Sequence, residues 1–349
     1  MSIELVPIRR LGLRLVFSNA PAAAVLFPCT KFRTAWPNVY NAVVSSGQKN
    51  LPHAEERLTE QRNPHSMSLD RLSTQEIIRL MNEEDRKIAA AVAREIPAIT
   101  RAADAIVNGM QNGGRLFYVG AGSSGRLGVL DAAECAPTFG TSRKQVQALI
   151  AGGKRAVTNA VEGAEDSTKN GERDLAAKQL TRNDVVVGIA ASGTTPYVIG
   201  ALKQARKRKA TTVAVTANRS MPVARVANIL IAPEVGPEVL TGSTRLKAGT
   251  AQKMVLNMLS TAAMVRMGHA YENLMIDLIS TNQKLSDRSL RILVEASGKS
   301  VSAAGHALRK SGHDLKVALV MLKKNTNVVE AKQSLKSAGG NLRLALGES

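Results

Sequence analysis

The chain contains the run Leu116-Phe-Tyr-Val-Gly-Ala-Gly-Ser-Ser-Gly-Arg-Leu-Gly-Val-Leu-Asp-Ala-Ala-Glu134, in which a short apolar strand leads into a Gly/Ser loop, a helix and an acidic residue. A strand that enters a glycine-rich turn leaves backbone N–H groups unpaired at the N-terminus of the next helix, where the helix dipole favours an anion. Ser123 and Ser124 add hydroxyl donors at the same place. The run therefore predicts a phosphate site between a strand and a helix.

The same run contains a G-x-G-x-x-G pattern at Gly120, Gly122 and Gly125. This pattern indicates a dinucleotide site only when an acidic residue closes the next strand. The next strand-like run, residues 146–150, is followed by Ala-Gly-Gly-Lys154, which offers no carboxylate to a ribose. A monophosphate is therefore favoured over a dinucleotide, and a glycine-rich turn without a ligand remains the alternative.

The composition is that of an α/β globular protein. The chain has 349 residues, of which 44% are hydrophobic and 27 are glycine. This length is enough for a full core and about two domains. No apolar run approaches the roughly 20 residues that a membrane-spanning helix needs. We expect a soluble, cytoplasmic protein without a membrane partner.

The charge and the metal-ligand residues exclude some classes of partner. A net charge of +19 suggests nucleic acid first, but the excess is dispersed and only 3% of residues are aromatic, so stacking platforms are scarce. Anionic metabolites are the favoured interpretation. Neither Cys29 nor Cys135 has a neighbour at metal-ligand spacing, and Cys135 is expected to be a buried hydrophobe. We expect no metal and no cofactor.

The part of the chain before the Gly/Ser loop divides into two regions. Residues 1–50 are expected to be a disordered N-terminal extension rather than a secretory signal, because Arg14, Asn19 and Pro21 interrupt the apolar stretch that a signal would need. Residues 51–113 are expected to be an N-terminal helical segment. Its Ser73-Thr-Gln-Glu76 sequence is a capping box, and Pro97 predicts a break between two helices.

Strand-like and helical runs then alternate through residues 114–286. This alternation predicts a three-layer α-β-α sandwich with a parallel five-stranded sheet. The strand-like runs are residues 116–119, 146–150, 185–190, 211–215 and 228–232. Residues 287–349 carry short helical repeats and are expected to form a small C-terminal helical module.

A second Gly/Ser loop, Ala191-Ser-Gly-Thr-Thr-Pro196, follows the strand-like run 185–190. A role as helix N-cap would by itself explain the Ser192 hydroxyl, without any ligand. Two such loops at the carboxyl ends of strands in one parallel sheet favour a ligand instead. The predicted phosphate ligands of the two loops are Ser123, Ser124, Ser192 and Thr195.

With these features in place, the chain resembles the N-acetylmuramic acid 6-phosphate etherases, a family of the sugar isomerase domain superfamily. The resemblance runs from about Leu58 to the C-terminus. Its most specific stretches are residues 120–134, Ala160-Val-Glu-Gly-Ala-Glu-Asp166 and Gly236-Pro-Glu-Val-Leu-Thr-Gly-Ser-Thr-Arg-Leu-Lys-Ala-Gly-Thr-Ala-Gln-Lys253. The third stretch is shared with the glucokinase regulatory protein.

The resemblance implies cleavage of a D-lactyl ether in the recycling of cell-wall amino sugars. In this family the sugar opens to its aldehyde, the C2 proton is removed, lactate leaves from C3 and water adds to the unsaturated intermediate. The reaction needs an acid and a base but no metal. The resemblance also implies a homodimer whose active sites draw residues from both subunits.

Two glutamates match the catalytic positions of the family. Glu134 is the expected acid that protonates departing lactate, and Glu165 is the expected second acid/base group. We expect the negative end of its helix and a nearby phosphate to favour the protonated form of Glu134. Further residues expected to line the site are Glu238, Ser243, Thr244, Arg245 and Lys247.

One residue of the second loop departs from the family pattern. The family has Arg where this chain has Thr194, which removes a fixed positive charge beside the expected phosphate. Two other functions share the predicted loops. A non-catalytic sugar-phosphate sensor would bind without turnover, and an aldose–ketose isomerase would not need both glutamates.

Overall fold

The computed structural model describes residues 6–7, 14–15, 57–278 and 283–348. The chain forms two compact units, Met1–Pro52 and His53–Ser349. In the first unit, β1 (Val6–Pro7) pairs antiparallel with β2 (Arg14–Leu15). Apart from these four residues, the disordered extension expected over residues 1–50 lies outside the described residues.

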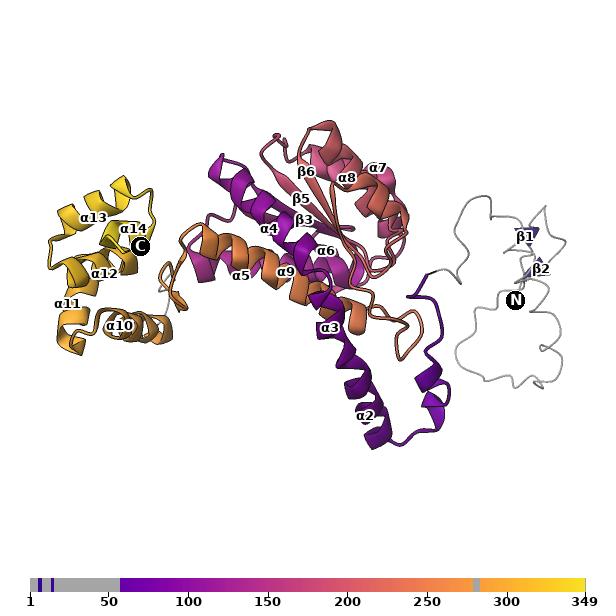
Figure 1. Ribbon diagram of the computed structural model, residues 1–349. Coiled ribbons are helices and arrows are strands. Elements are labelled where there is room, and N and C mark those ends of the chain that lie inside the picture. Colours follow the sequence, from indigo (N-terminus) through magenta and orange to yellow (C-terminus); the bar gives the residue numbers. More distant parts are fainter. Residues whose placement is uncertain (1–5, 8–13, 16–56, 279–282, 349) are drawn as a thin grey trace, which may run out of the picture. The chain divides into compact units, whose positions relative to one another are not determined.

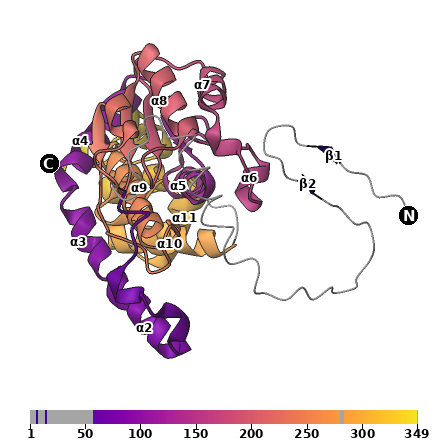
Figure 2. The ribbon, with the colours of Figure 1, turned by 90° about the vertical axis from the view of Figure 1, so that its right-hand side faces the viewer.

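The second unit begins with two 3-10 helices and three α-helices. Ser73 caps α2, because its hydroxyl accepts the Glu76 N–H and the Glu76 carboxylate accepts the Ser73 N–H, so the predicted capping box is confirmed. Pro97 lies in the first turn of the third α-helix, which confirms the break before it. These elements are η2 (Pro64–Ser66), η3 (Leu69–Arg71), α2 (Thr74–Asp85), α3 (Lys87–Ala93) and α4 (Ile96–Gln111), and Figure 1 and Figure 2 show the three α-helices following one another.

A parallel five-stranded sheet has the order β4-β3-β5-β6-β7. Its strands are β3 (Leu116–Gly120), β4 (Val146–Ile150), β5 (Val185–Ile189), β6 (Thr211–Val215) and β7 (Ile229–Ile231). All five predicted strands are confirmed. The next strand in the sequence, β4, lies on one side of β3, and the strand after it, β5, lies on the other side. Loops diverge at such a switch point, where α/β sheets bind their ligands.

Helices cover both faces of this sheet, which confirms the predicted three-layer sandwich (Figure 1). On one face, Tyr118 packs with α4, α5 (Gly122–Phe139) and α9 (Lys247–Arg266). On the other face, Phe117 and Val119 pack with α7 (Thr168–Ala176) and α8 (Pro196–Lys207). Neighbouring residues of β3 thus enter different cores, as the period of a strand requires.

Short elements complete the sandwich. The turns between strands contain α6 (Arg155–Thr158), η4 (Ala164–Asp166) and η5 (Pro222–Val226). After α9, β8 (Ala270–Tyr271) pairs antiparallel with β9 (Leu274–Met275). None of the described helices is both long and apolar enough to span a bilayer.

Five helices near the C-terminus enclose a third hydrophobic cluster, which includes Tyr271 and Ile276. Gly339 and Gly340, with φ of +60° and +82°, separate the last two helices. The helices are α10 (Gln283–Ser297), α11 (Val301–Lys310), α12 (Leu315–Lys324), α13 (Val328–Ser337) and α14 (Leu342–Leu346). The domain boundaries given above stay predictions.

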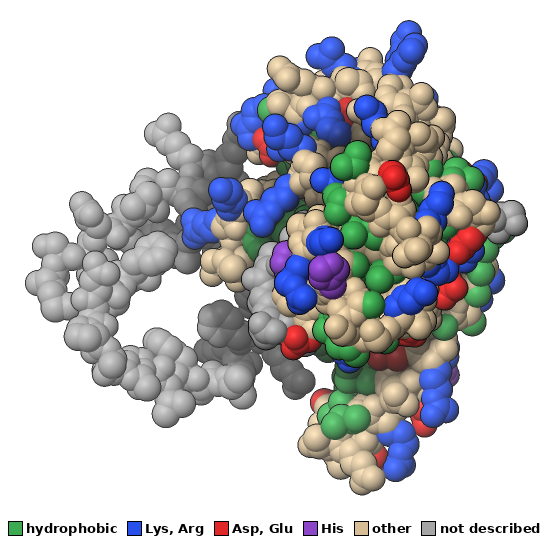
Figure 3. All heavy atoms as spheres, turned by 90° about the vertical axis from the view of Figure 1, so that its left-hand side faces the viewer, with side chains coloured by type: hydrophobic (Ala, Val, Ile, Leu, Met, Phe, Trp, Pro, Cys, Tyr) green, Lys and Arg blue, Asp and Glu red, His purple; other side chains and the backbone are tan. Residues whose placement is uncertain are grey.

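Positive charge is dispersed over the surface. Figure 3 shows Lys and Arg side chains scattered over one face of the molecule, with apolar and neutral side chains between them. At the end of α8, Arg206 and Lys207 lie in the last turn, where cations offset the helix dipole. The absence of a nucleic-acid partner stays a prediction.

Candidate active site

A cavity of about 350 Å³ lies at the carboxyl ends of β3 and β5. It brings together both Gly/Ser loops and the segment that carries Glu165. The residues that line it are Arg57, Glu60, Ala121, Gly122, Ser123, Ser124, Glu165, Asp166, Ile189, Ala191, Ser192, Thr194, Thr195, Pro196, Gly242 and Thr244. Six predicted site residues therefore share one cavity: Ser123, Ser124, Glu165, Ser192, Thr195 and Thr244.

Two helices begin at this cavity without a side-chain cap. The N-cap residue of α5 is Ala121 and that of α8 is Thr195, and neither side chain makes a capping hydrogen bond. The first N–H groups of a helix have no partner within the helix, and they attract anions together with the dipole. Two helix N-termini at one cavity are therefore suited to bind a phosphate.

Ser192 does not cap α8, which corrects the alternative interpretation of its hydroxyl. Its Oγ accepts hydrogen bonds from the Thr194 N–H at 3.2 Å and from Thr194 Oγ1 at 3.0 Å. These bonds fold the second loop back on itself. The helix start of α8 remains uncapped at the cavity wall.

Ser124 has a partner that the sequence analysis missed. Its hydroxyl donates to Gln252 Oε1 on α9 at 2.9 Å, and the Gln252 residue is 2% exposed. The Gln252 Nε2 is buried and has no hydrogen-bond partner among the described residues. Gln252 thus fixes the Ser124 side chain. Its position within the stretch 236–253 is the one signal that could have identified it.

Glycines let the loops approach the sheet closely. A Cβ on Gly120 would lie 2.7 Å from the Gly125 Cα, so strand and helix could not pack as they do. Gly193 has a φ of +73°, and a Cβ there would lie 2.5 Å from the Met221 Cβ. Larger residues at these positions would displace the loops that form the cavity.

Glu165 lies in η4, exposed at the cavity wall. Arg126 holds the preceding segment, because its guanidinium donates to the carbonyls of Ala156 at 3.0 Å, Val157 at 3.0 Å and Asn159 at 2.9 Å. These hydrogen bonds from Arg126 therefore fix the loop that leads to Glu165.

Glu134 does not line the cavity. It is exposed on α5, twelve residues after Gly122, so it lies about 18 Å farther along the helix axis. A phosphate in this cavity and Glu134 of the same chain thus lie near opposite ends of α5. Within one copy of the chain Glu134 is therefore remote from this cavity, and its expected proximity to the phosphate stays a prediction. The catalytic role of Glu134 stays a prediction.

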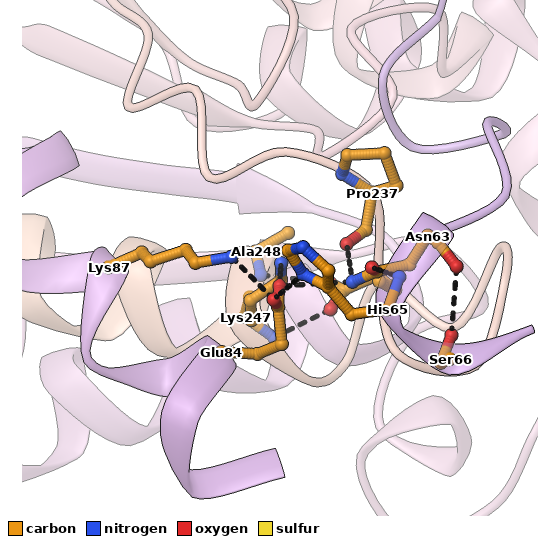
Figure 4. A network of polar contacts seen from close by, with 9 residues as sticks. Asn63, His65, Ser66, Glu84, Lys87, Pro237, Lys247 and Ala248 are labelled. Carbon is orange, nitrogen blue, oxygen red and sulfur yellow. Dashed lines mark hydrogen bonds and ion pairs between the residues drawn. The ribbon is translucent and has the colours of Figure 1, made fainter. Parts of the chain in front are cut away.

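Glu238 and Lys247 lie outside the cavity lining and support its wall. The Glu238 carboxylate accepts the N–H groups of Lys247 and Ala248, each at 3.0 Å, at the start of α9. The Lys247 Nζ pairs with Glu84 Oε2 at 2.6 Å, and both side chains are buried (Figure 4). Both side chains therefore have partners within the protein and hold the loop that contains Gly242 and Thr244 against α9 and α2.

Glu84 is the centre of the polar network in Figure 4, which we call the Glu84 network. Burial raises the pKa of Glu84, but hydrogen bonds from four neighbours outweigh it and hold the pKa far below its usual value. The neighbours are Lys247, Lys87, His65 and Asn63. Asn63 also donates to the Pro237 carbonyl at 3.1 Å, so the network joins the N-terminal segment, α2 and the loop before α9.

The remaining predicted site residues lie outside the cavity lining. Ser243 is half-buried and Arg245 is exposed, and neither lines the cavity. Cys135 is buried, as predicted, and burial raises the pKa of its thiol to about 12. Two lining residues, Arg57 and Glu60, were missed because they lie in no motif of the sequence analysis.

Two domain families match the chain. The SIS domain family matches residues 159–262, and the family of the glucokinase regulatory protein N-terminal SIS domain matches residues 98–206. Among solved structures, a phosphoheptose isomerase from Francisella tularensis is 19% identical, with a TM-score of 0.43 over 55% of this chain and 98% of that chain.

Curated relatives are much more similar. An N-acetylmuramic acid 6-phosphate etherase of Pectobacterium atrosepticum is 54% identical over 289 residues, which cover 83% of this chain and 95% of that protein. An etherase of the same name from Yersinia pestis (strain Pestoides F) is 53% identical over 83% of this chain and 98% of that protein. Because this similarity covers nearly the whole length of both relatives, the chain belongs to the N-acetylmuramic acid 6-phosphate etherase family.

Proposed function

We propose that this enzyme cleaves the D-lactyl ether of N-acetylmuramic acid 6-phosphate, giving N-acetylglucosamine 6-phosphate and D-lactate. The names of the relatives support this substrate. One observation of the structure carries the proposal furthest. The uncapped N-termini of α5 and α8 meet at one hydroxyl-lined cavity, and the carboxylate of Glu165 lies on its wall.

The hydroxyl groups and helix N-termini would hold the 6-phosphate. Ser123 supplies its hydroxyl from the start of α5, where Ser124 can supply its backbone N–H because its hydroxyl proton goes to Gln252. Ser192 and Thr195 supply hydroxyls from the loop before α8. Thr244 adds a hydroxyl from the loop that the Glu84 network supports. Charge-assisted bonds to a phosphate are about twice as strong as neutral ones, so these donors would anchor one end of the sugar.

The proposed chemistry is an elimination followed by a hydration. In the open-chain sugar the aldehyde acidifies the C2 proton, a base removes it, and the C3–O bond breaks. The oxygen leaves with lactate and takes a proton from an acid. Water then adds across the C2–C3 double bond, so one water is consumed overall. Glu165, on the cavity wall, is the proposed second acid/base group, and Glu134 is the proposed acid for lactate.

We infer that the active enzyme is a homodimer in which Glu134 reaches the cavity of the other subunit. Within one chain, Glu134 lies farther along α5 than the C3–O bond of a sugar can lie from its own phosphate. The apolar side chains of α2 support a second subunit. Ile78 is 62% exposed, and Ile77, Leu80 and Met81 are half-buried on a helix whose one buried residue is Glu84.

The central test is an assay of D-lactate release from N-acetylmuramic acid 6-phosphate. Wild-type protein should release lactate, and both Glu134→Ala and Glu165→Ala should not. If wild-type protein binds the substrate tightly without releasing lactate, the proposed function is wrong. That outcome would favour the sugar-phosphate sensor, the alternative consistent with the glucokinase regulatory protein domain match.

A mixed-subunit experiment tests the dimer. The two inactive variants, Glu134→Ala and Glu165→Ala, are unfolded and refolded together in equal amounts. If each site combines the two glutamates from different subunits, the mixture should regain about a quarter of wild-type activity, since half the dimers are mixed and each has one intact site. Mixing should restore nothing if both glutamates act in one chain.

We also propose that the enzyme works in the cytoplasm, where phosphorylated sugars are held. Fractionation of cells that produce the protein should find it with cytoplasmic markers. Recovery from the membrane or the periplasm would contradict this assignment.

A further inference from the structure

We propose that Arg57 binds the substrate phosphate and supplies the fixed positive charge of the cavity. This inference rests on the proposed function, because it adds a residue to the same site. Among the described residues that line the cavity, Arg57 alone is cationic, whereas Glu60, Glu165 and Asp166 are acidic. A phosphate ester carries a charge of about −1.5 to −2 near neutral pH, so these carboxylates would repel it unless a cation were present.

The guanidinium of Arg57 is available for a ligand. Its Nε is buried and has no hydrogen-bond partner among the described residues. No ion pair within the described structure includes Arg57, although three carboxylates line the same cavity. A buried donor without a partner costs free energy and needs an explanation. The forked N–H groups of an arginine match the geometry of a phosphate, which would satisfy them.

The other cations near the site are engaged or lie elsewhere. Arg126 donates to three backbone carbonyls, and Lys247 pairs with Glu84. Arg245 is exposed and does not line the cavity. In the second loop, Thr194 is neutral and donates its hydroxyl to Ser192. The positive charge that the second loop lacks is thus supplied by Arg57, in the segment before η2.

The first experiment measures binding of N-acetylglucosamine 6-phosphate, which has a phosphate but no lactyl group, by calorimetry. Arg57→Gln should weaken binding about 10- to 100-fold, the range for losing a hydrogen bond to a charged group. Arg57→Lys should weaken it less, because a lysine keeps the charge without the fork. Binding of unphosphorylated N-acetylglucosamine should not change in either variant.

Two further variants make the test specific. Arg62→Gln is the matched control, since Arg62 is an exposed cation of the same segment outside the cavity lining. It should bind as wild type does. Thr194→Arg in the Arg57→Gln background should restore much of the lost affinity, because it places a cation beside the same anion. In turnover, Arg57→Gln should raise KM more than it lowers kcat.

Three outcomes separate this inference from the proposed function. If Arg57→Gln binds N-acetylglucosamine 6-phosphate as tightly as wild type, the inference is wrong, and lactate release by wild type still supports the etherase. If affinity falls only for the lactyl substrate, Arg57 binds the lactyl carboxylate and the phosphate assignment is wrong. If wild type releases no lactate but phosphate binding depends on Arg57, the inference holds and the proposed function fails.

Discussion

The cavity at the ends of β3 and β5 and the Glu84 network use similar side chains in opposite ways. In the Glu84 network both carboxylate oxygens are paired, Oε1 with His65 and Lys87, and Oε2 with Asn63 and Lys247. In the cavity, two helix starts lack caps and the Arg57 Nε lacks a partner among the described residues. Paired buried charges fix positions, whereas unpaired donors at a cavity are free to bind a ligand.

The largest effect on catalysis is expected from removing the carboxylate of Glu165 from the cavity wall. Glu165→Gln should lower kcat by about 10²- to 10⁴-fold, the usual contribution of a positioned acid or base. The free energy of unfolding should stay within about 0.5 kcal/mol of wild type, because Glu165 is exposed. Steady-state kinetics and urea unfolding measure the two quantities. Glu295→Gln, an exposed glutamate of α10, is the control that should change neither.

Breaking the Glu84 network should act on stability first. Lys247→Met leaves the buried Glu84 without its buried partner and should lower the free energy of unfolding by about 3–5 kcal/mol. Urea unfolding at neutral pH measures this loss. The double variant Lys247→Met with Glu84→Leu should regain much of it, since no buried carboxylate is left. A loss below about 1 kcal/mol in the single variant would show that the ion pair does not hold this region.

Acid should weaken the same network by a smaller amount. The pKa of Glu84 is lower in the folded chain than in the unfolded chain, so the unfolded chain binds a proton first as the pH falls. The stabilisation is therefore complete above the ordinary glutamate pKa of about 4.3 and decreases below it. The difference in urea midpoint between wild type and Glu84→Gln should stay nearly constant down to about pH 5 and shrink as the pH is lowered from about 5 to about 3. A constant difference would contradict the assigned pKa direction.

The smallest expected effect is on ligand affinity, and it tests how the serine at the start of α5 is positioned. Gln252→Leu removes the acceptor of the Ser124 hydroxyl and should weaken binding of N-acetylglucosamine 6-phosphate about 3- to 10-fold, as for one neutral hydrogen bond. Calorimetry checks this value. Ser124→Ala should weaken binding at least as much, and adding Gln252→Leu to it should cost little more. Full additivity of the two changes would mean that Gln252 acts independently of Ser124.

Local features of the structure could be predicted from the sequence. The strands have short apolar runs bounded by turns, and the start of α2 has Ser73 and Glu76 at capping-box spacing, so neighbouring residues decide these elements. The two Gly/Ser loops could be placed at one cavity because the carboxyl ends of parallel strands meet at one edge of a sheet.

Long-range pairing could not be predicted. Glu84 and Lys247 are 163 residues apart, and no local pattern shows that the lysine is buried against that carboxylate. The resemblance therefore placed Lys247 at the ligand, where the structure gives it a supporting position. Arg57 was missed for a similar reason, because its availability depends on burial and on the absence of a protein partner. Glu134 was expected both near the C-terminal end of its helix and near a phosphate at the N-terminal end, and the 18-residue length of α5 separates these two places within one chain.

That length has a consequence for how this family can vary. The helix α5 runs without a break from Gly122 to Phe139, and Glu134 lies in its last two turns, before Pro137. One inserted residue between Gly122 and Glu134 would advance the carboxylate by about 1.5 Å and rotate it about 100° around the axis. Insertions there would redirect Glu134. Chains that retain the etherase chemistry should therefore keep the residue count of this helix unchanged.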